Sequence, residues 1–199
     1  PIGTGQAREA IRQALSCSHL RLVGLHCHIG SQVFETQPFQ EAIRATLEFA
    51  AKMREEGLEL IEFSPGGGFA IPYTRNDQAP SIAQYADAIT SSFRQGCQEL
   101  GFGKPAFVIE PGRSIVGPAG IVVYTIGARK AIPGIRTYVS VDGGMGDNIR
   151  PALYQASYEV VVANRMNQPS MELVTIAGKY CESGDILVKD VDLPVTEPG

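Results

Sequence analysis

Short apolar runs alternate with longer helical patterns over the first 117 residues, and this alternation is the strongest constraint on the fold. The apolar runs at 20–25, 58–63 and 105–109 are expected to be strands, and residues 6–16 and 36–56 are expected to be helices. A spacing of roughly forty residues between strands predicts parallel βα units. Such units build either a TIM-type barrel or an open doubly wound sheet, and the pattern alone does not separate the two.

A third helix is expected to begin at Ser81. Gln84 follows three residues later, which is the spacing of a capping box. The buried face of this helix is expected to carry Ile82, Tyr85, Ile89 and Phe93.

The sequence changes in texture after about residue 116. Apolar runs at 121–126, 137–141, 158–163, 171–176 and 186–191 are separated by turn residues, with no long helical pattern between them. We therefore predict two domains, 1–117 and 118–199. Three strands cannot close a barrel that needs eight. The expected fold is α/β: a partial (β/α)8 TIM-type barrel followed by a mostly-β domain, both incomplete. The chain begins at Pro1 without Met, so we expect it to be a piece of a longer protein.

Composition narrows the possible partners and the compartment. A net charge of −4 gives no support for nucleic-acid binding. The sequence contains no apolar run long enough to span a membrane and no recognisable signal peptide. The four cysteines form no CxxC pair, which favours free thiols in a reducing cytoplasm.

Polar residues follow each predicted parallel strand, at the edge where βα proteins build their sites. His26 and His28 lie two residues apart and could reach one metal ion, although no third ligand is evident. Alternatively, one histidine packs against a flat ligand, with Ser31 as a hydroxyl donor, or is a satisfied core histidine.

The second and third strand ends suggest an anion site. Gly66, Gly67 and Gly68 could direct backbone N–H groups at a phosphate, or could form only a tight turn. Glu110 could face a protonatable ring nitrogen while Arg113 faces a phosphate or carboxylate. The alternative for these two residues is an ordinary ion pair.

Two later segments carry further candidates. Pro151 is expected to restrict Arg150 to extended geometry, so that Arg150 and Tyr154 suit an anionic group such as a carboxylate. A surface loop with an arginine salt bridge is the alternative. Cys181 and Glu182 lie in a glycine-bounded loop, although a lone cysteine is more often simply buried.

Five segments occur in a specific order along the chain. They are HIGSQ (28–32), PGGGF (65–69), EPGRSIV (110–116), VDGGMGDNIRPALY (141–154) and GKYCESGDIL (178–187). This succession resembles the diaminopimelate decarboxylases, pyridoxal-phosphate enzymes with an alanine-racemase-like barrel. The resemblance covers nearly the whole chain.

The resemblance implies a role for each candidate. His28 would stack on the cofactor ring, and Glu110 would keep the pyridine nitrogen protonated. The cofactor phosphate would be held by Ser31, Gly66, Gly67 and Gly68, and Arg113 would be shared between phosphate and substrate. Arg113, Arg150 and Tyr154 would hold the substrate carboxylate. Cys181, a proton donor, and Glu182, a reader of the distal amino group, would enter the active site of the other subunit, which implies a homodimer. His28 and Cys181 are thus the expected catalytic residues.

The sequence departs from the family pattern in three places. Gly146 stands where Asn is common, and Ala70 where Gly is common. The Schiff-base lysine of the family, in a Tyr-x-x-Lys-Ala-Asn context, has no counterpart among Lys52, Lys104, Lys130, Lys179 and Lys189. We therefore expect the full-length enzyme to convert meso-2,6-diaminopimelate to L-lysine and carbon dioxide, and this chain alone to be inactive. The alternatives are a decarboxylase of another basic amino acid or carboxynorspermidine, or a non-catalytic regulatory homologue.

Overall fold

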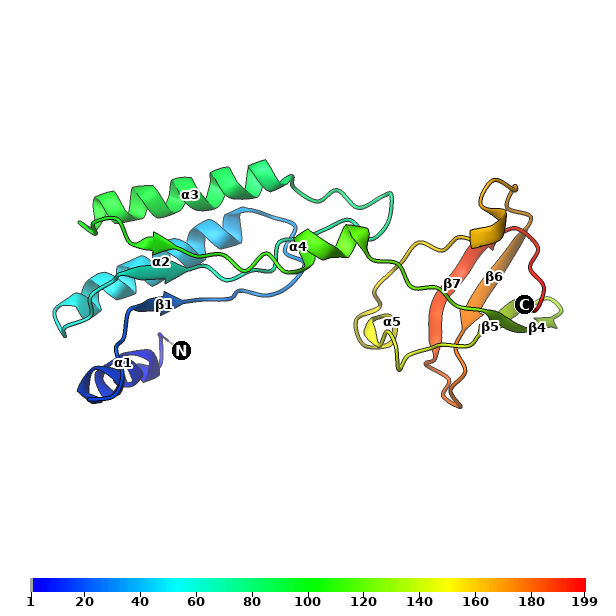
Figure 1. Ribbon diagram of the computed structural model, residues 1–199, viewed down its shortest axis with the longest axis horizontal. Coiled ribbons are helices and arrows are strands. Elements are labelled where there is room, and N and C mark those ends of the chain that lie inside the picture. Colours follow the sequence, from blue (N-terminus) through cyan, green and yellow to red (C-terminus); the bar gives the residue numbers. More distant parts are fainter. Residues whose placement is uncertain (1) are drawn as a thin grey trace. The chain divides into compact units, whose positions relative to one another are not determined.

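The computed structural model describes residues 2–199, which divide into two compact units (Figure 1). The first unit comprises the chain up to Pro72 together with Gln78–Ala119. The second comprises Tyr73–Asp77 together with Gly120–Gly199. The domain bounds predicted from the sequence, 1–117 and 118–199, stay a prediction.

The first unit is built on a parallel sheet in the order β1-β2-β3. The strands β1 (Gly24–His26), β2 (Glu62–Ser64) and β3 (Ala106–Phe107) are short, and helices α2 (Gln37–Arg54) and α3 (Ile82–Glu99) connect them. The predicted parallel βα units are confirmed. The first strand begins later than expected, because the Val23 carbonyl accepts N–H groups from both Ile61 and Glu62 and so interrupts the regular ladder.

The core of the first unit lies between the sheet and two helices. Side chains of α2 and α3 enclose Phe63 of β2, and Figure 1 shows these two helices running beside the strands. The fully buried members from α2 are Phe39, Ile43 and Leu47. Helix α1 (Gln6–Ser16) packs on α2 through Ile11.

Helix α3 confirms the predicted capping box, since Ser81 and Gln84 exchange both hydrogen bonds. Tyr85, Ile89 and Phe93 are buried as expected. The expectation for Ile82 is wrong, because this side chain is 77% exposed. As the first residue of the helix, it has no preceding turn to pack against.

The second unit is a four-stranded mixed sheet in the order β4-β5-β6-β7. Strands β4 (Ile126–Ile132) and β5 (Arg136–Val141) are antiparallel, as are β6 (Glu172–Ala177) and β7 (Ile186–Leu193), whereas β5 and β6 are parallel. Alternate apolar residues of these strands form the core: Val139, Val141, Val174, Ile176, Leu187 and Leu193. A short helix α5 (Arg150–Tyr154) and a 3-10 turn η2 (Ala163–Arg165) also belong to this unit, whereas the 3-10 turn η1 (Gly117–Ala119) ends the first unit.

Two predicted strands are corrected. Of the run 121–126, only Ile126 joins a strand, and Ile121, Val122 and Val123 are exposed. The run 158–163 forms no strand and leads into η2, although Val160 and Val162 pack against the core. Residues with high β-propensity become strands only where a partner supplies the ladder hydrogen bonds, and neither residues 121–124 nor residues 158–162 pair with a strand among the described residues 2–199.

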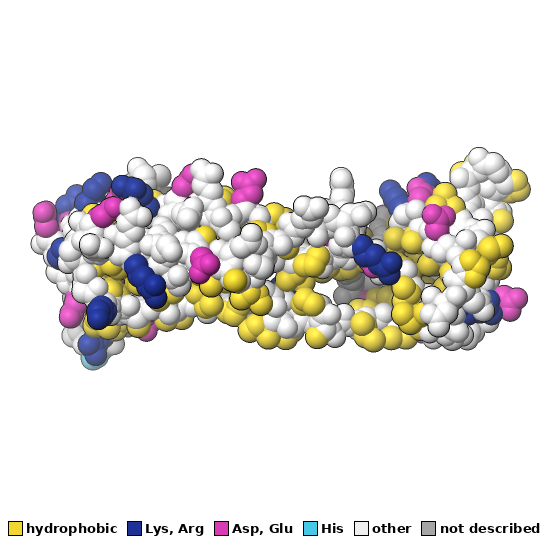
Figure 2. Space-filling model, turned by 90° about the horizontal axis from the view of Figure 1, so that it is seen from above, with side chains coloured by type: hydrophobic (Ala, Val, Ile, Leu, Met, Phe, Trp, Pro, Cys, Tyr) yellow, Lys and Arg dark blue, Asp and Glu magenta, His cyan; other side chains and the backbone are white. Residues whose placement is uncertain are grey.

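The surface mixes charged and apolar side chains (Figure 2). In the first unit the exposed apolar residues include Val108 and Ile109, which directly follow the edge strand β3. None of the described helices is both long enough and apolar enough to cross a membrane.

Candidate active site

Backbone hydrogen bonds bring the loops after β1, β2 and β3 together at the carboxyl edge of the sheet. The Cys27 N–H donates to the Ser64 carbonyl at 2.9 Å, and the Glu110 N–H donates to the Gly66 carbonyl at 2.9 Å. Further along, the Val33 N–H donates to the Gly68 carbonyl at 3.0 Å. The residues expected to bind a cofactor therefore converge through main-chain contacts.

The glycine turn 66–68 requires glycine because other backbone lies against it. Gly66 and Gly68 have positive φ angles of 76° and 94°. A Cβ at Gly67 would collide with the Glu110 carbonyl oxygen, and one at Gly68 would collide with the Gly30 carbonyl and lie 3.5 Å from the Ser31 Cα. Ser31 thus lies beside the turn.

The His28 ring is seated on this turn. The Gly67 N–H donates to His28 Nδ1 at 3.3 Å, so in the neutral ring the proton is on Nε2. The Gly66 N–H also donates within the protein, to Ser64 Oγ at 3.1 Å. Two of the three amides expected to face a phosphate are therefore engaged internally in this structure.

Glu110 has a partner that sequence reasoning missed. His26 Nε2 lies 3.1 Å from Glu110 Oε1, and both side chains are half-exposed. From the sequence, His26 was considered as a metal ligand, as a ring that packs on a flat ligand or as a core histidine. Nothing in the sequence indicated a carboxylate partner from the loop after the third strand. The described residues contain no group of three or more His, Cys, Asp or Glu that could hold a metal ion.

Two further side chains that the sequence did not single out fasten the loops. The Tyr85 hydroxyl, from α3, donates to the Val33 carbonyl at 2.6 Å and accepts the Ala70 N–H at 3.1 Å. The Gln32 side chain donates to the Ile71 carbonyl and accepts the Ile71 N–H, each at 3.0 Å. Gln32 belongs to the HIGSQ segment, and this motif was the sequence feature that could have identified it.

Arg113 opens a short helix α4 (Arg113–Val116) directly beyond Gly112, in the same loop as Glu110. The Ser114 hydroxyl donates to the Pro111 carbonyl at 2.6 Å and closes this turn. Cys27, between the two histidines, is not a reactive group. Burial raises the pKa of its thiol, and a hydrogen bond with Thr46 opposes that rise only in part.

In the second unit, Arg150 is helical and not extended, which corrects the expectation. Pro151 lies in the first turn of α5, where its missing N–H costs no helical hydrogen bond and its fixed φ suits the helix. The prediction overlooked this tolerance for proline at a helix start.

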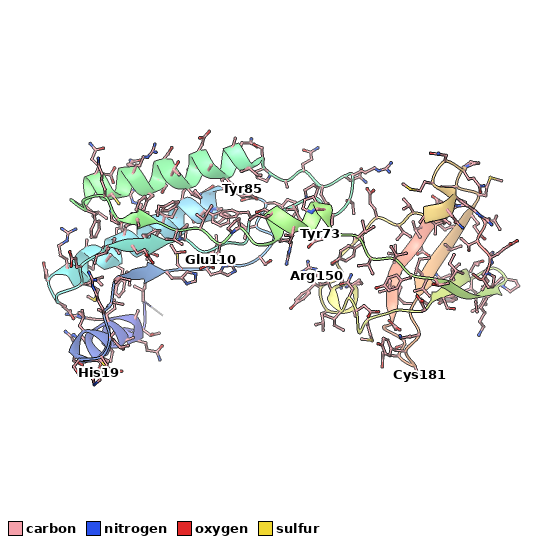
Figure 3. The ribbon with its side chains drawn as sticks, in the orientation of Figure 1. His19, Tyr73, Tyr85, Glu110, Arg150 and Cys181 are labelled. Carbon is pink, nitrogen blue, oxygen red and sulfur yellow. The ribbon has the colours of Figure 1, made fainter. Side chains whose placement is uncertain are left out.

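Three tyrosines lie near the Arg150 guanidinium, and Figure 3 labels one of them, Tyr73. Its Nε donates to the Tyr158 hydroxyl at 2.9 Å. Its Cζ lies 5.4 Å from the Tyr73 ring centroid and 5.8 Å from that of Tyr154. The predicted pair Arg150 and Tyr154 is thus brought together. Tyr73 and Tyr158, whose rings meet edge to face at 5.0 Å, were missed.

Cys181 and Glu182 lie in the turn between β6 and β7, and both are exposed (Figure 3). Glu182 Oε1 accepts hydrogen bonds from the Ser183 hydroxyl and the Gly184 N–H, each at 3.2 Å. The Cys181 thiol is free, as are those of the other cysteines, Cys17, Cys27 and Cys97. The two predicted residues therefore share one turn.

Comparisons with known proteins follow the same division of the chain. Residues 2–117 match the family model of the pyridoxal-binding domain of pyridoxal-dependent decarboxylases. The diaminopimelate decarboxylase of Synechocystis sp. is 50% identical over 180 residues, which cover 90% of this chain and 38% of that protein. The Bacillus subtilis diaminopimelate decarboxylase is 45% identical over 196 residues, which cover 98% of this chain and 45% of that protein.

A solved structure agrees with these matches. The crystal structure of the M. jannaschii diaminopimelate decarboxylase in complex with L-lysine superposes with a TM-score of 0.89 at 35% identity. The superposition covers 100% of this chain and 44% of the M. jannaschii chain. This chain therefore spans less than half the length of these relatives.

These matches confirm the resemblance inferred from the five segments, and they confirm the fold class, an α/β partial barrel followed by a mostly-β part. The family model covers more than half of the chain. The chain belongs to the pyridoxal-dependent decarboxylase family.

Proposed function

We propose that the protein containing this chain is a pyridoxal-phosphate-dependent diaminopimelate decarboxylase, which converts meso-2,6-diaminopimelate to L-lysine and carbon dioxide. One observation carries the proposal: His28, the glycine turn 66–68 and Glu110 meet at one sheet edge. They do so in a chain 45–50% identical to proteins of that name.

The first unit has a glycine turn and an ordered histidine that suit the phosphate and the ring of pyridoxal phosphate. The turn at Gly66–Gly68 is a cradle that a Cβ would fill, and Ser31 lies beside it as a hydroxyl donor. His28 is an imidazole whose orientation the Gly67 N–H fixes. Because the Gly66 and Gly67 amides already donate within the protein, their part in phosphate binding requires those bonds to be exchanged.

The proposed roles follow from the chemistry of each group. When bound, pyridoxal phosphate supplies a protonated pyridine ring that takes up the electron pair released as carbon dioxide departs. The Glu110 carboxylate would hold the proton on the ring nitrogen. The His28 ring would pack on the face of the cofactor. Arg113 neutralises phosphate or carboxylate at the same loop.

The second unit is proposed to read the substrate. Arg150 offers a planar guanidinium, and Tyr154 a phenol, to a substrate carboxylate. Glu182 accepts hydrogen bonds from the distal ammonium group, and Cys181 donates a proton to the carbon that has lost carbon dioxide. The last two act in the site of a second subunit, so the working protein is a homodimer. Four free thiols support a cytoplasmic location.

The lysine that binds the cofactor lies outside this chain in our proposal. In the first unit, Lys52 is on α2 and Lys104 precedes β3, at the amino end of that strand. Lys130, Lys179 and Lys189 belong to the second unit. The full-length protein must therefore be used for any assay.

The test is product analysis with purified full-length protein and pyridoxal phosphate. Meso-diaminopimelate, L-lysine, L-ornithine and carboxynorspermidine are supplied separately, and carbon dioxide and the amine product are quantified. We expect L-lysine from meso-diaminopimelate and at least a hundredfold lower kcat/KM with the others (~100-fold is within reach of buried polar recognition). The proposal is overturned if carbon dioxide is released faster from another substrate than from meso-diaminopimelate. It is also overturned if none of the substrates releases carbon dioxide. Gel filtration at assay concentration tests the dimer.

A further inference from the structure

A single buried carboxylate joins two loops of the second unit. Asp185, in the segment before β7, is 2% exposed. Its Oδ1 accepts the Met145 N–H at 2.6 Å, and its Oδ2 accepts the Tyr180 N–H at 2.8 Å. The two donors come from segments 35 residues apart, so Asp185 is a bridge between loops and not a local turn residue.

Backbone bonds reinforce this bridge. The Gly178 N–H donates to the Asp185 carbonyl at 2.9 Å, and the Asp185 N–H donates to the Glu182 carbonyl at 3.0 Å. The Lys179 N–H donates to the Gly143 carbonyl at 2.9 Å. The turn 178–185 and the loop 143–148 therefore form one hydrogen-bonded assembly, with the Asp185 carboxylate in its interior.

The glycines of both segments leave room for that carboxylate. A Cβ at Gly144 would lie 2.6 Å from Asp185 Oδ2 and 2.7 Å from Oδ1. A Cβ at Gly178 would collide with the same two oxygens. Burial of a carboxylate costs free energy unless its oxygens are satisfied, and charge-assisted bonds to backbone N–H groups are a strong way to satisfy them. Gly144 and Gly178 thus leave the space that the buried Asp185 carboxylate occupies.

The Asp185 bridge joins two segments that carry residues proposed to bind the substrate. Tyr180 directly precedes Cys181 and Glu182, which are exposed at the tip of the turn. Met145 lies in the loop that leads to Arg150. Gly184 and Ser183 are the contacts of the Glu182 carboxylate, and both belong to the same turn. Asp185 and the Lys179–Gly143 bond join that turn to the Met145 loop, and the Tyr180 ring also lies against Gly144 and Gly146.

We propose that Asp185 is a positioning residue for substrate recognition: its carboxylate fixes the turn bearing Cys181 and Glu182 against the loop that leads to Arg150. This role rests on the proposed function. Asp185 does not itself touch the substrate. It holds the turn proposed to enter the site of the second subunit against the loop that leads to Arg150.

The test uses full-length protein with Asp185→Asn, and Asp192→Asn as a control of equal charge change on the exposed side of β7. An amide has one oxygen, so it accepts only one of the two N–H groups and turns a donor towards the other. We expect amide hydrogen exchange at Met145 and Tyr180 to accelerate about tenfold or more, and KM for meso-diaminopimelate to rise about tenfold. The affinity for pyridoxal phosphate is expected to stay unchanged.

Gly144→Ala provides a second, independent variant in case Asp185→Asn folds poorly. It keeps the charge but drives a methyl group against both carboxylate oxygens. The same pair of changes, local exchange and KM, is expected. Unchanged exchange in both variants overturns the proposal, and so does faster exchange with an unchanged KM. A wild-type protein without decarboxylase activity defeats the proposed function instead, while the exchange rates still decide whether Asp185 fixes the loops.

Discussion

The two units hold their candidate residues by different means. In the first, His28, the glycine turn and Glu110 follow directly on parallel strands, and main-chain hydrogen bonds join the three loops. In the second, Arg150 is held by tyrosine side chains, and the Cys181–Glu182 turn depends on the Asp185 carboxylate. A site on strand ends inherits the geometry of the sheet, whereas a site on loops needs particular side chains to fix it.

The largest expected effect is a fall in kcat when the Glu110 carboxylate of the first unit is removed and its backbone contacts are kept. Glu110→Gln keeps the backbone bridge to the glycine turn but removes the carboxylate proposed to hold the ring proton. We expect kcat of the full-length enzyme to fall by about 10²–10³-fold, the range for loss of one group that stabilises charge as the reaction proceeds. Glu62→Gln, exposed on β2, is the matched control. A kcat within a few-fold of wild type would remove Glu110 from the proposed mechanism.

Arg150→Lys would sharpen the comparison from the side of the second unit. Lysine keeps the charge but cannot preserve both the bond to the Tyr158 hydroxyl and a planar fork for a carboxylate. We expect KM for meso-diaminopimelate to rise roughly tenfold, with the affinity for pyridoxal phosphate unchanged. Arg75→Lys, in a highly exposed pair with Glu159, controls for the substitution itself. Steady-state kinetics that show equal KM values for the two variants would contradict this role.

Tyr85→Phe tests how far the first unit depends on one side chain. The change leaves the Val33 carbonyl and the Ala70 N–H without their hydroxyl partner in a buried place. We expect the free energy of unfolding to drop by about 1–3 kcal/mol. The main-chain bonds between the loops remain, so affinity for pyridoxal phosphate should stay near wild type. Denaturant titration and cofactor titration measure the two. A large loss of cofactor affinity would contradict the statement that main-chain hydrogen bonds hold the candidate site of the first unit.

The smallest expected effect concerns acid stability of the second unit. Arg129 makes a two-pronged pair with Glu172, and its hydrogen bonds lower the pKa of the Glu172 carboxyl below its ordinary value of 4.5. A carboxyl with a lowered folded-state pKa stabilises the fold above its unfolded-state pKa. That stability is lost as pH falls through the folded-state value. Glu172→Gln should therefore cost about 1 kcal/mol at neutral pH and less below pH 4. Thermal melts at both pH values test this, and an equal loss at both contradicts it.

The sequence predicted the elements that rest on local pattern. Helix periodicity, the capping box at Ser81 and the apolar run at 137–141 depend on near neighbours, and the structure has them. Sequence reasoning failed in two places. Residues 121–124 have high β-propensity yet lack a partner strand among the described residues, and Arg150 is helical because Pro151 is tolerated in the first turn of α5.

The candidate site divides in the same way. His28, Ser31, the glycine turn and Glu110 lie within known motifs, so their nearness followed from parallel strands ending at one edge. The contacts of His26 with Glu110, of Tyr73 with Arg150 and of Asp185 with Met145 join residues dozens of positions apart. No local rule relates such residues, and only packing of the chain brings them together.

A crystal structure of the full-length protein with pyridoxal phosphate and L-lysine would test the central claim most directly. The account predicts the Glu110 carboxylate at about 3 Å from the pyridine nitrogen, a hydrogen-bonding distance. It also predicts the His28 ring on the cofactor face and the phosphate at Ser31 and the glycine turn. A cofactor whose ring nitrogen faces another group, or whose phosphate lies away from Gly66–Gly68, would contradict it.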